Sequence, residues 1–390
     1  MFHIDISPPQ ARLRGPILAI MLVFGAYWHA VLFPLITTDI ANDYIPWFNH
    51  IVDADAVNAF AKPFGAYSPP YLYLLALATP LKGLIADVII VKIVAMIGNL
   101  AAAVAFWRLL LALRIDDAPR RALCLLALPS LMINAAMLGQ SDAMYVAPVL
   151  MAVAAAIERR HRAMLAWCGL ALAIKMQTVL IGPFILVILV ARRVPLHYWL
   201  MTPLTYLAAL APAWAAGWPI DDLLTVYFRQ ATTFSDIARN APNIWMVARE
   251  LGYNSNVVAG LASVIAVGAI AAYLARYIAT ARHFSPEMLL RLALLAPLIG
   301  AGLLPRMHER YFLLADILSV ALAIVSRAPG VWKVPVAVQL GSLFGLFGYG
   351  MGLPWLAALG AIPMVLATWL VLQSLLNRAA NDNPLLVRPF

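Results

Sequence analysis

The chain has 390 residues, of which 64% are apolar and only 12% are charged. Such a composition leaves too little polar surface to cover a water-soluble fold, so a soluble globular protein is excluded. The formal net charge of +9 does not indicate a nucleic-acid partner, because Lys and Arg come in short clusters between apolar runs, as anchors against anionic lipid do.

The apolar runs predict an all-α polytopic membrane protein with about twelve transmembrane helices in a single integral membrane domain over 1–390. A helix that crosses a bilayer needs about 20 mostly apolar residues. The stretch 163–191 is long enough for two short spans broken near Lys175. Ten other runs lie near 16–36, 88–110, 122–138, 142–157, 197–217, 255–279, 289–304, 311–326, 332–350 and 354–376. The polar start before residue 15 is followed by no small-residue cleavage signature, so we expect a retained first helix.

Two long loops interrupt this series, over 37–87 and 218–252. In the first loop, the segment from Pro69 to Leu81 is too short to span and opens with two prolines, so we predict an interfacial helix. The second loop is amphipathic and aromatic, which also favours an interfacial segment. Cys124 and Cys168 lie inside apolar runs and show no spacing typical of a disulfide framework or a zinc site.

The distribution of Lys and Arg predicts that both termini are cytoplasmic. With this orientation, eighteen of the 27 Lys and Arg residues fall on inner segments, among them Arg12, Arg14, Arg378 and Arg388. Five polar motifs then face the other side of the membrane. They are the loop that starts at Asp39, the segments 139–142 and 174–177, the loop 218–252 and the segment 307–311.

Asp39 and Asp43, spaced i, i+4, are the first candidate pair. One carboxylate can take a proton from an acceptor hydroxyl while the other binds that acceptor. Asp39 is nearer the apolar run and is the better candidate for the base. Two solvated loop acids are the alternative.

Three further motifs carry polar side chains at helix ends. Asp142, with Gln140, is either an acceptor ligand or simply a helix N-cap with Ser141. Lys175 breaks an apolar segment, and with Gln177 it is a candidate for phosphate binding, the alternative being a side chain that snorkels to the interface.

The segment from Arg306 to Tyr311 is the densest polar cluster. His308, Arg310, Arg306 and Tyr311 together could bind a departing phosphate, because Arg offers a planar fork to phosphate oxygens. A structural Glu309–Arg310 pair is the alternative. Neither GxGxxG nor GxxxxGK[ST] occurs, so a nucleotide sugar has no visible binding loop.

In their joint order, these motifs resemble the GT-C superfamily of polytopic glycosyltransferases, and are most similar to bacterial relatives of the GPI mannosyltransferases. The resemblance covers residues 37–326, including Tyr67-Ser68-Pro69-Pro70-Tyr71 and Asn240-Ala241-Pro242-Asn243-Ile244-Trp245. It implies a bacterial inner-membrane enzyme with an extracytoplasmic active site. That enzyme would move one sugar, mannose-like or similar, from a polyprenyl-phosphate donor to a glycan or glycolipid acceptor.

We therefore predict an inverting transfer with Asp39 as the general base. The Asp-x-Asp or Glu-Asp pair common in parts of the superfamily is missing, so the sequence assigns no metal ligand and leaves a divalent-metal requirement open. A lipid-linked-sugar flippase or transporter is the main alternative, although the internal repeats typical of transporters are not evident. A non-catalytic subunit of an envelope-polysaccharide complex is a third reading.

Overall fold

A computed structural model describes residues 13, 15–232 and 235–381, with side chains described for 13, 15–230 and 235–377. Arg12, Arg14, Arg388 and the Arg378 side chain lie outside these residues. The helices of ten or more residues are α1 Gly15–Leu32, α4 Asp87–Ala112, α7 Asp142–Ile157, α8 His161–Ile174, α9 Gly182–Ala191, α11 Met201–Ala215, α12 Ile220–Thr232, α14 Asn256–Ile278, α15 Pro286–Leu303, α16 Leu313–Val325, α17 Lys333–Gly350 and α19 Ala361–Asn381.

Shorter elements join these helices. The short α-helices are α2 Ile45–Asp53, α3 Pro69–Leu77, α5 Ala118–Leu123, α6 Pro129–Met132, α10 Leu196–Trp199, α13 Ile244–Glu250 and α18 Pro354–Leu359. Two π-helices cover Ile40–Tyr44 and Ile133–Met137, and 3-10 turns cover Asn58–Ala61, Thr79–Leu81, Cys124–Ala127, Met176–Ile181 and Ala281–His283. Within the described part of the chain, the strands are β1 Ala238–Arg239 and β2 Met307–His308, which pair in parallel.

The expectation of an all-α multi-pass membrane protein is confirmed. Among the described residues, five helices are long and apolar enough to cross a bilayer, or six if the bent pair Ala118–Ala127 and Pro129–Met137 is one span. This number is lower than the expected twelve. Four of the other expected segments form apolar helices of only 10–17 residues. The runs 197–217 and 332–350 form α11 and α17, of 15 and 18 residues, which are also not among the candidate spans. Lys175 accounts for one break: α8 ends at Ile174 and Lys175 is extended.

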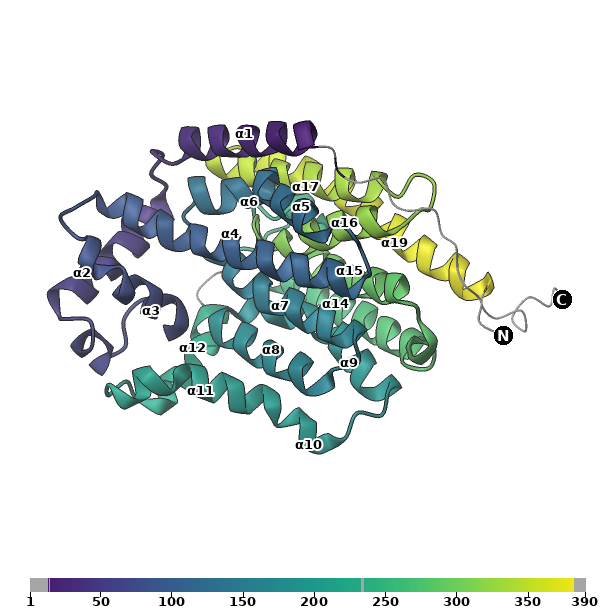
Figure 1. Cartoon of the computed structure of the whole chain (residues 1–390), viewed down its shortest axis with the longest axis horizontal. Coiled ribbons are helices and arrows are strands. Elements are labelled where there is room, and N and C mark those ends of the chain that lie inside the picture. Colours follow the sequence, from purple (N-terminus) through teal and green to yellow (C-terminus); the bar gives the residue numbers. More distant parts are fainter. Residues whose placement is uncertain (1–12, 14, 233–234, 382–390) are drawn as a thin grey trace.

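The helices lie roughly along the long axis of the molecule, with α7 at the centre (Figure 1). Neighbours of α7 include α4 and α8, and α8 in turn packs on α11. Nearly all of α7 is buried inside the protein, whereas only 6% of the spanning window of α1 is buried. A helix that is apolar all round and unburied by protein is expected at the lipid boundary, so α1 is peripheral.

The two ends of the bundle differ. In Figure 1 the short α2 and α3 lie at one end, and α19 reaches towards the other. Helix α3 has only nine residues, too few to cross a bilayer, and its interfacial position stays a prediction. Arg192, which follows α9, donates to the backbone of Ala156 near the end of α7, and α9 also contacts the turn Ala281–His283, so the turns that contain Arg159, Arg192 and Arg282 lie near one another.

Candidate active site

A cavity of about 680 Å³ lies among the helix ends and loops that carry the polar motifs. Its volume lies in the usual range for a small-molecule site. Four of the five motifs line it directly, and 139–142 lies behind its wall. The expected site residues in the lining are Asp39, Asp43, Lys175, Gln177, Arg306, His308, Arg310 and Tyr311.

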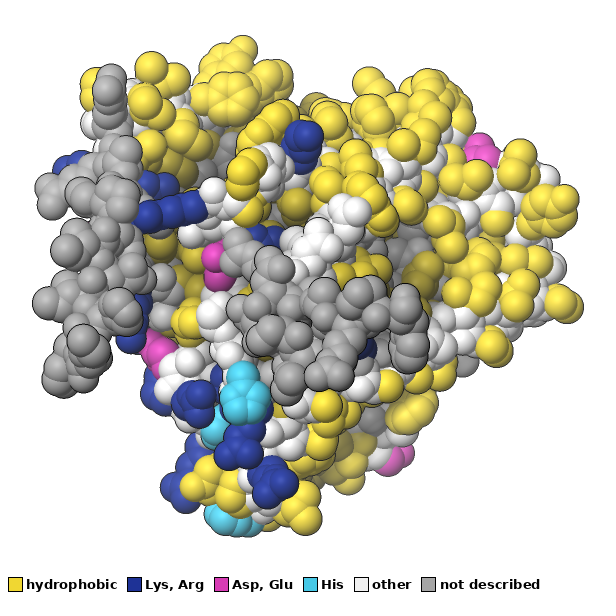
Figure 2. All heavy atoms as spheres, turned by 90° about the vertical axis from the view of Figure 1, so that its right-hand side faces the viewer, with side chains coloured by type: hydrophobic (Ala, Val, Ile, Leu, Met, Phe, Trp, Pro, Cys, Tyr) yellow, Lys and Arg dark blue, Asp and Glu magenta, His cyan; other side chains and the backbone are white. Residues whose placement is uncertain are grey.

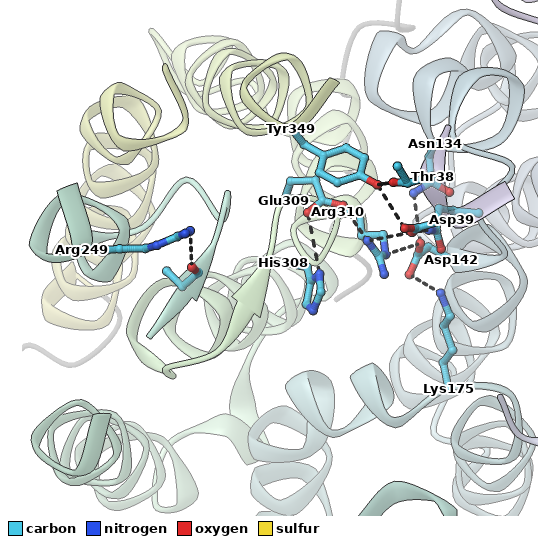
Figure 3. A network of polar contacts seen from close by, with 12 residues as sticks. Thr38, Asp39, Asn134, Asp142, Lys175, Arg249, His308, Glu309, Arg310 and Tyr349 are labelled. Atoms are coloured by element: carbon cyan, nitrogen blue, oxygen red, sulfur yellow. Dashed lines mark hydrogen bonds and ion pairs between the residues drawn. The ribbon is translucent and has the colours of Figure 1, made fainter. Parts of the chain in front are cut away.

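Asp39 stands at the N-terminal edge of the π-helix Ile40–Tyr44, and its side chain is 29% exposed. One carboxylate oxygen accepts a hydrogen bond from the Gln140 amide at 2.6 Å. The other accepts from the Tyr349 hydroxyl at 3.0 Å (Figure 3). Each oxygen therefore has a fixed donor, while part of the group faces the cavity. The carboxylate is held in one orientation and remains reachable.

Gln140 relays this contact to a tyrosine pair. Its carbonyl oxygen accepts a hydrogen bond from Tyr67 at 3.0 Å, and the Tyr67 hydroxyl lies 2.8 Å from that of Tyr44. Gly139, just before Gln140, has φ +64°, and an added Cβ would lie 3.0 Å from Ile40. Only glycine adopts this backbone without strain, so the turn sets Gln140 against Asp39.

Arg310 lies at the meeting point of three carboxylates (Figure 3). Its guanidinium nitrogens are 2.6 Å from Glu309, 3.6 Å from Asp142 and 3.8 Å from Asp39. Opposite charges this close in a buried site interact strongly and favour the charged forms. Burial lowers the pKa of Arg310, but Glu309 and Asp142, with Tyr67 and Tyr311, outweigh this effect and hold the pKa well above its usual value. The structural Glu309–Arg310 pair is therefore present, and it also faces the cavity.

Asp142 is fully buried, and Gln140 is 1% exposed. Asp142 accepts hydrogen bonds from Lys175 at 2.9 Å and from Asn134 at 3.1 Å. The N-cap alternative does not describe this site: Ser141 occupies the cap position, and its side chain makes no cap hydrogen bond. The structure thus places Gln140 and Asp142 where they support Asp39, Lys175 and Arg310 rather than in the cavity wall.

Lys175 does not snorkel, because it is 4% exposed and its ammonium lies 4.7 Å from the centre of the Tyr67 ring. Neighbouring Gln177 hydrogen-bonds the Tyr311 hydroxyl. Together with the Asp142 contact, these interactions tie the helix break between α8 and α9 to the segment that carries Arg310.

The pairing of β1 with β2 brings the 218–252 loop to the second cluster. Arg239 is in register with His308, and the backbone N–H of Arg306 donates to Ile237 at 2.7 Å. Burial, together with the charges of Arg310, Arg239 and Lys175, holds the pKa of His308 well below its usual value. The imidazole is therefore neutral in a region of positive potential, a setting that attracts an anion.

Asp43 lines the cavity on the Asp39 side. Burial and the charge of Asp39 raise its pKa, and Arg310 partly offsets this effect. Beside it, the rings of Tyr44, Trp47 and Tyr67 form an aromatic wall with centroid separations of 5.2–5.9 Å. One side of the cavity is therefore acidic and aromatic, and the other is basic.

Four contributors were not singled out from the sequence: Tyr349, Arg239, Asn134 and Tyr67. Arg239 lies two residues before the Ala-Pro-Asn segment, and Tyr67 opens the Tyr-Ser-Pro-Pro segment. Both residues therefore belong to segments that the sequence analysis noted, but neither was given a function there. Tyr349 and Asn134 gave no signal, since each is a single polar residue in an apolar run. Among the described residues, no group of three or more His, Cys, Asp or Glu side chains is arranged to hold a metal ion.

The sequence matches glycosyltransferase family 87 over residues 66–305, more than half of the chain. The chain belongs to glycosyltransferase family 87. The fold is also similar to that of ArnT from Cupriavidus metallidurans, solved with undecaprenyl phosphate. That similarity has a TM-score of 0.53 at 15% identity and covers 94% of this chain and 79% of ArnT. A search of the curated proteins gave no match.

Family membership and fold agree with the resemblance drawn from the motifs. This family 87 protein is a GT-C membrane glycosyltransferase. The family region begins at residue 66 and ends at 305. It therefore includes Tyr67, Gln140, Asp142 and Lys175, whereas Asp39 and the His308–Arg310 segment lie beyond it and are tied to it by the contacts described above.

Proposed function

We propose that this glycosyltransferase moves a single sugar from a polyprenyl-phosphate donor to a glycan or glycolipid acceptor on the extracytoplasmic side of a bacterial inner membrane, with inversion at the anomeric carbon. Membership of family 87 supports the transfer of a sugar. The donor class is supported by the shared fold of ArnT, which was solved with undecaprenyl phosphate bound.

One observation carries the proposal: a reachable carboxylate and a set of buried cations face the same cavity. Asp39 lies 3.8 Å from Arg310, and both line the space that His308, Arg239 and Lys175 also border. A glycosyl transfer from a lipid phosphate needs a base for the acceptor and positive charge for the leaving phosphate, within the reach of one saccharide.

In the proposed step, an acceptor hydroxyl attacks the anomeric carbon from the face opposite the phosphate. The new bond joins the acceptor oxygen to that carbon, while the bond from the carbon to the phosphate oxygen breaks and leaves its electron pair on the phosphate. Asp39 takes the hydroxyl proton. Arg310, His308 and Lys175 stabilise the negative charge that develops on the leaving group.

The basic and acidic sides of the cavity suggest where each substrate binds. Arg239, Arg306, His308 and Arg310 come from the β1–β2 region and its continuation, and we assign the donor phosphate to them, together with Gln177 and Tyr311. Asp43 and the aromatic wall adjoin Asp39 and suit a hydroxyl-rich acceptor, because aromatic faces pack against sugar rings and a carboxylate accepts from hydroxyls.

Replacement of Asp39 by Asn tests this assignment, because it removes the base and keeps the shape. In lipid nanodiscs supplied with radiolabelled polyprenyl-phosphate mannose and lipid extract, we expect transfer to fall by on the order of 10²–10⁴-fold. Donor binding, measured by retention of the label, is expected to persist. Asp53→Asn, which alters an exposed acid of the same loop, is the control.

Near-normal turnover of the Asp39→Asn protein removes Asp39 from the base role. The same assay separates a transferase from a flippase, because a flippase moves labelled donor across a vesicle membrane without consuming it. An unaltered donor that has changed leaflet therefore contradicts the proposal, and a labelled product supports it.

A further inference from the structure

Helices α7, α8 and α9 each have one end beside the cavity, and basic residues gather at their other ends. Helix α7 starts at Asp142, and α8 ends next to Lys175. At about 1.5 Å per residue, their 16 and 14 residues place the opposite ends roughly 20 Å from the cavity. There the chain turns from α7 to α8 through Arg159, and α9 ends beside Arg192.

This end of the three helices is strongly basic. Segments 158–162 and 192–193 hold five arginines and one acid, Glu158. The Glu158 carboxylate is taken up by Arg160, which donates from Nε at 2.7 Å, and by Arg108 at 3.8 Å. Among the described residues, Arg159 and Arg192 form no ion pair. We call Arg159, His161, Arg192 and Arg193 the basic cluster.

Two buried nitrogen atoms of the basic cluster have no hydrogen-bond partner in the described part of the protein: Nε of Arg192 and Nε2 of His161. A buried polar group without a partner is costly, and like charges held together add to that cost. Burial and the Arg159 charge both lower the pKa of Arg192. The cluster is thus incomplete as a network of protein groups alone.

Two helices end at the cluster through left-handed residues, Arg159 with φ +61° and Arg193 with φ +50°. The N–H of the following residue donates to Ala155 at 2.8 Å in the first turn and to Leu189 at 2.9 Å in the second, as is usual where a helix ends. Helix α8 starts at His161 without a side-chain cap, so its positive dipole end points into the cluster. This dipole favours an anion at this place.

Other basic turns of the protein contain their own acids. Arg120 lies 3.9 Å from Asp117, and Arg291 lies 2.7 Å from Glu287. The basic cluster differs because its nearest acid is occupied by two other arginines. Figure 2 shows the end of the molecule opposite α2 and α3, with Lys, Arg and His side chains gathered in the lower part, at the height of α8 to α10 in Figure 1.

An apolar surface adjoins the cluster. Leu196 and Leu200, which follow Arg193, are 77% and 57% exposed, and Val190 just before Arg192 is 47% exposed. The guanidinium of Arg162 lies 4.4 Å from the centre of the Tyr198 ring in α10. Cations above exposed aliphatic side chains match a lipid that has an anionic headgroup and acyl chains.

We propose that the basic cluster binds the phosphate of an anionic phospholipid headgroup, with the acyl chains against the exposed side chains of α9 and α10. The phosphate lies between Arg159 and Arg192 and offsets their repulsion. This site is separate from the sugar-transfer cavity and does not depend on the proposed function.

The test uses the full-length protein, delipidated in detergent and then titrated with phosphatidylglycerol, phosphatidylcholine or inorganic phosphate. Native mass spectrometry counts the retained lipid, and thermal unfolding reports stabilisation. We expect phosphatidylglycerol to be retained and to raise the melting temperature. In Arg192→Gln its retention is expected to fall about tenfold, the loss of one charge-assisted contact. Lys62→Gln removes an exposed charge from the loop 37–87, at the other end of the molecule, and is the control.

Equal retention by Arg192→Gln, Lys62→Gln and the unaltered protein overturns the proposal, because Arg192 then makes no contribution to the binding. Stabilisation by inorganic phosphate to the same extent overturns the assignment to a lipid. Should Arg192→Gln fail to fold, Arg159→Gln is measured in its place, because that substitution also removes one positive charge from the basic cluster. Unchanged retention in that variant overturns the proposal equally.

Discussion

Asp39 depends on two side chains that are 101 and 310 residues away in the chain, Gln140 and Tyr349. Each donates to a different carboxylate oxygen, so rotation of the carboxylate breaks one bond or both. Such donors affect the rate of proton transfer through position rather than through contact with substrate.

Tyr349→Phe removes one of these bonds, together with the 3.1 Å contact between the Tyr349 and Thr38 hydroxyls, and keeps the ring in the cavity wall. We expect kcat to fall by about tenfold, the equivalent of one hydrogen bond, with the donor KM little changed. Tyr253→Phe, at a hydroxyl on a 62% exposed residue, is expected to leave both constants unaltered. A raised KM at constant kcat would mean that Tyr349 contacts a substrate instead of orienting Asp39.

His308 gives a prediction about pH. Its pKa in the folded protein lies well below 6.5, because of burial and three nearby cations, so below pH 6.5 the unfolded chain binds a proton that the folded protein does not. The free energy of unfolding therefore falls as pH drops below 6.5, by up to about 1.4 kcal/mol per pH unit. In His308→Gln this contribution is absent.

Melting temperatures of the two proteins between pH 5 and 8 measure this effect. We expect the unaltered protein to lose stability relative to His308→Gln as the pH is lowered, and the two curves to run parallel above about pH 7. Parallel curves over the whole range would show that the pKa of His308 is the same in the folded and the unfolded protein.

At the scale of elements, the sequence predicted the helices and breaks whose cause is local. Pro69 and Pro70 mark the start of α3, and Lys175 marks the break after α8, because prolines and an ionisable group in an apolar run act on their own segment. The π-helices at Ile40–Tyr44 and Ile133–Met137 and the β1–β2 pairing were not predicted. They depend on contacts between segments far apart in the chain.

The same distinction applies to the site. The residues that gather at the cavity stood out because each is polar at an apolar boundary. The sequence did not show which of these residues line the cavity and which lie behind its wall and support the others. Asp39 and Asp142, for example, are both acids at helix ends. Only packing decides that Asp142 is fully buried against Lys175 while Asp39 stays 29% exposed.

Substitution of Gly139 tests whether the turn between the π-helix Ile133–Met137 and α7 positions the Asp39 carboxylate. Gly139→Ala would strain a backbone at φ +64° and press a methyl group on Ile40, next to Asp39. Gly83→Ala meets a similar strain at φ +82°, with no atom within 4 Å of the added carbon. We expect each variant to lose about 1 kcal/mol of stability from backbone strain.

Turnover separates the two variants. Gly139→Ala is expected to lose about tenfold or more in kcat, because a shift of Gln140 or Ile40 misplaces the Asp39 carboxylate. Gly83→Ala is expected to keep its kcat at temperatures where it stays folded. Equal activities at matched folded fractions would show that the turn does not position the base.

At the scale of the whole molecule, the charges at the two ends of the bundle predict its orientation in the membrane. Asn256, at the start of the 23-residue helix α14, contacts Arg306 at the cavity, and the helix ends at Ile278. At about 1.5 Å per residue this helix spans roughly 35 Å, the thickness of a bilayer core, so Arg282 lies on the side opposite the cavity. Val57, 67% exposed, lies in the loop 37–87 on the cavity side.

Labelling with a membrane-impermeant maleimide tests this orientation. In a chain with Cys124→Ala and Cys168→Ala, Val57→Cys is expected to react in intact spheroplasts. Arg282→Cys is expected to react only after the membrane is permeabilised, because basic turns remain in the cytoplasm. The reverse pattern would put the cavity in the cytoplasm, where an extracytoplasmic acceptor could not reach Asp39. Since the helices that reach Asp142 and Lys175 begin or end at the basic cluster, the same reversal would also move the proposed lipid site to the outer leaflet.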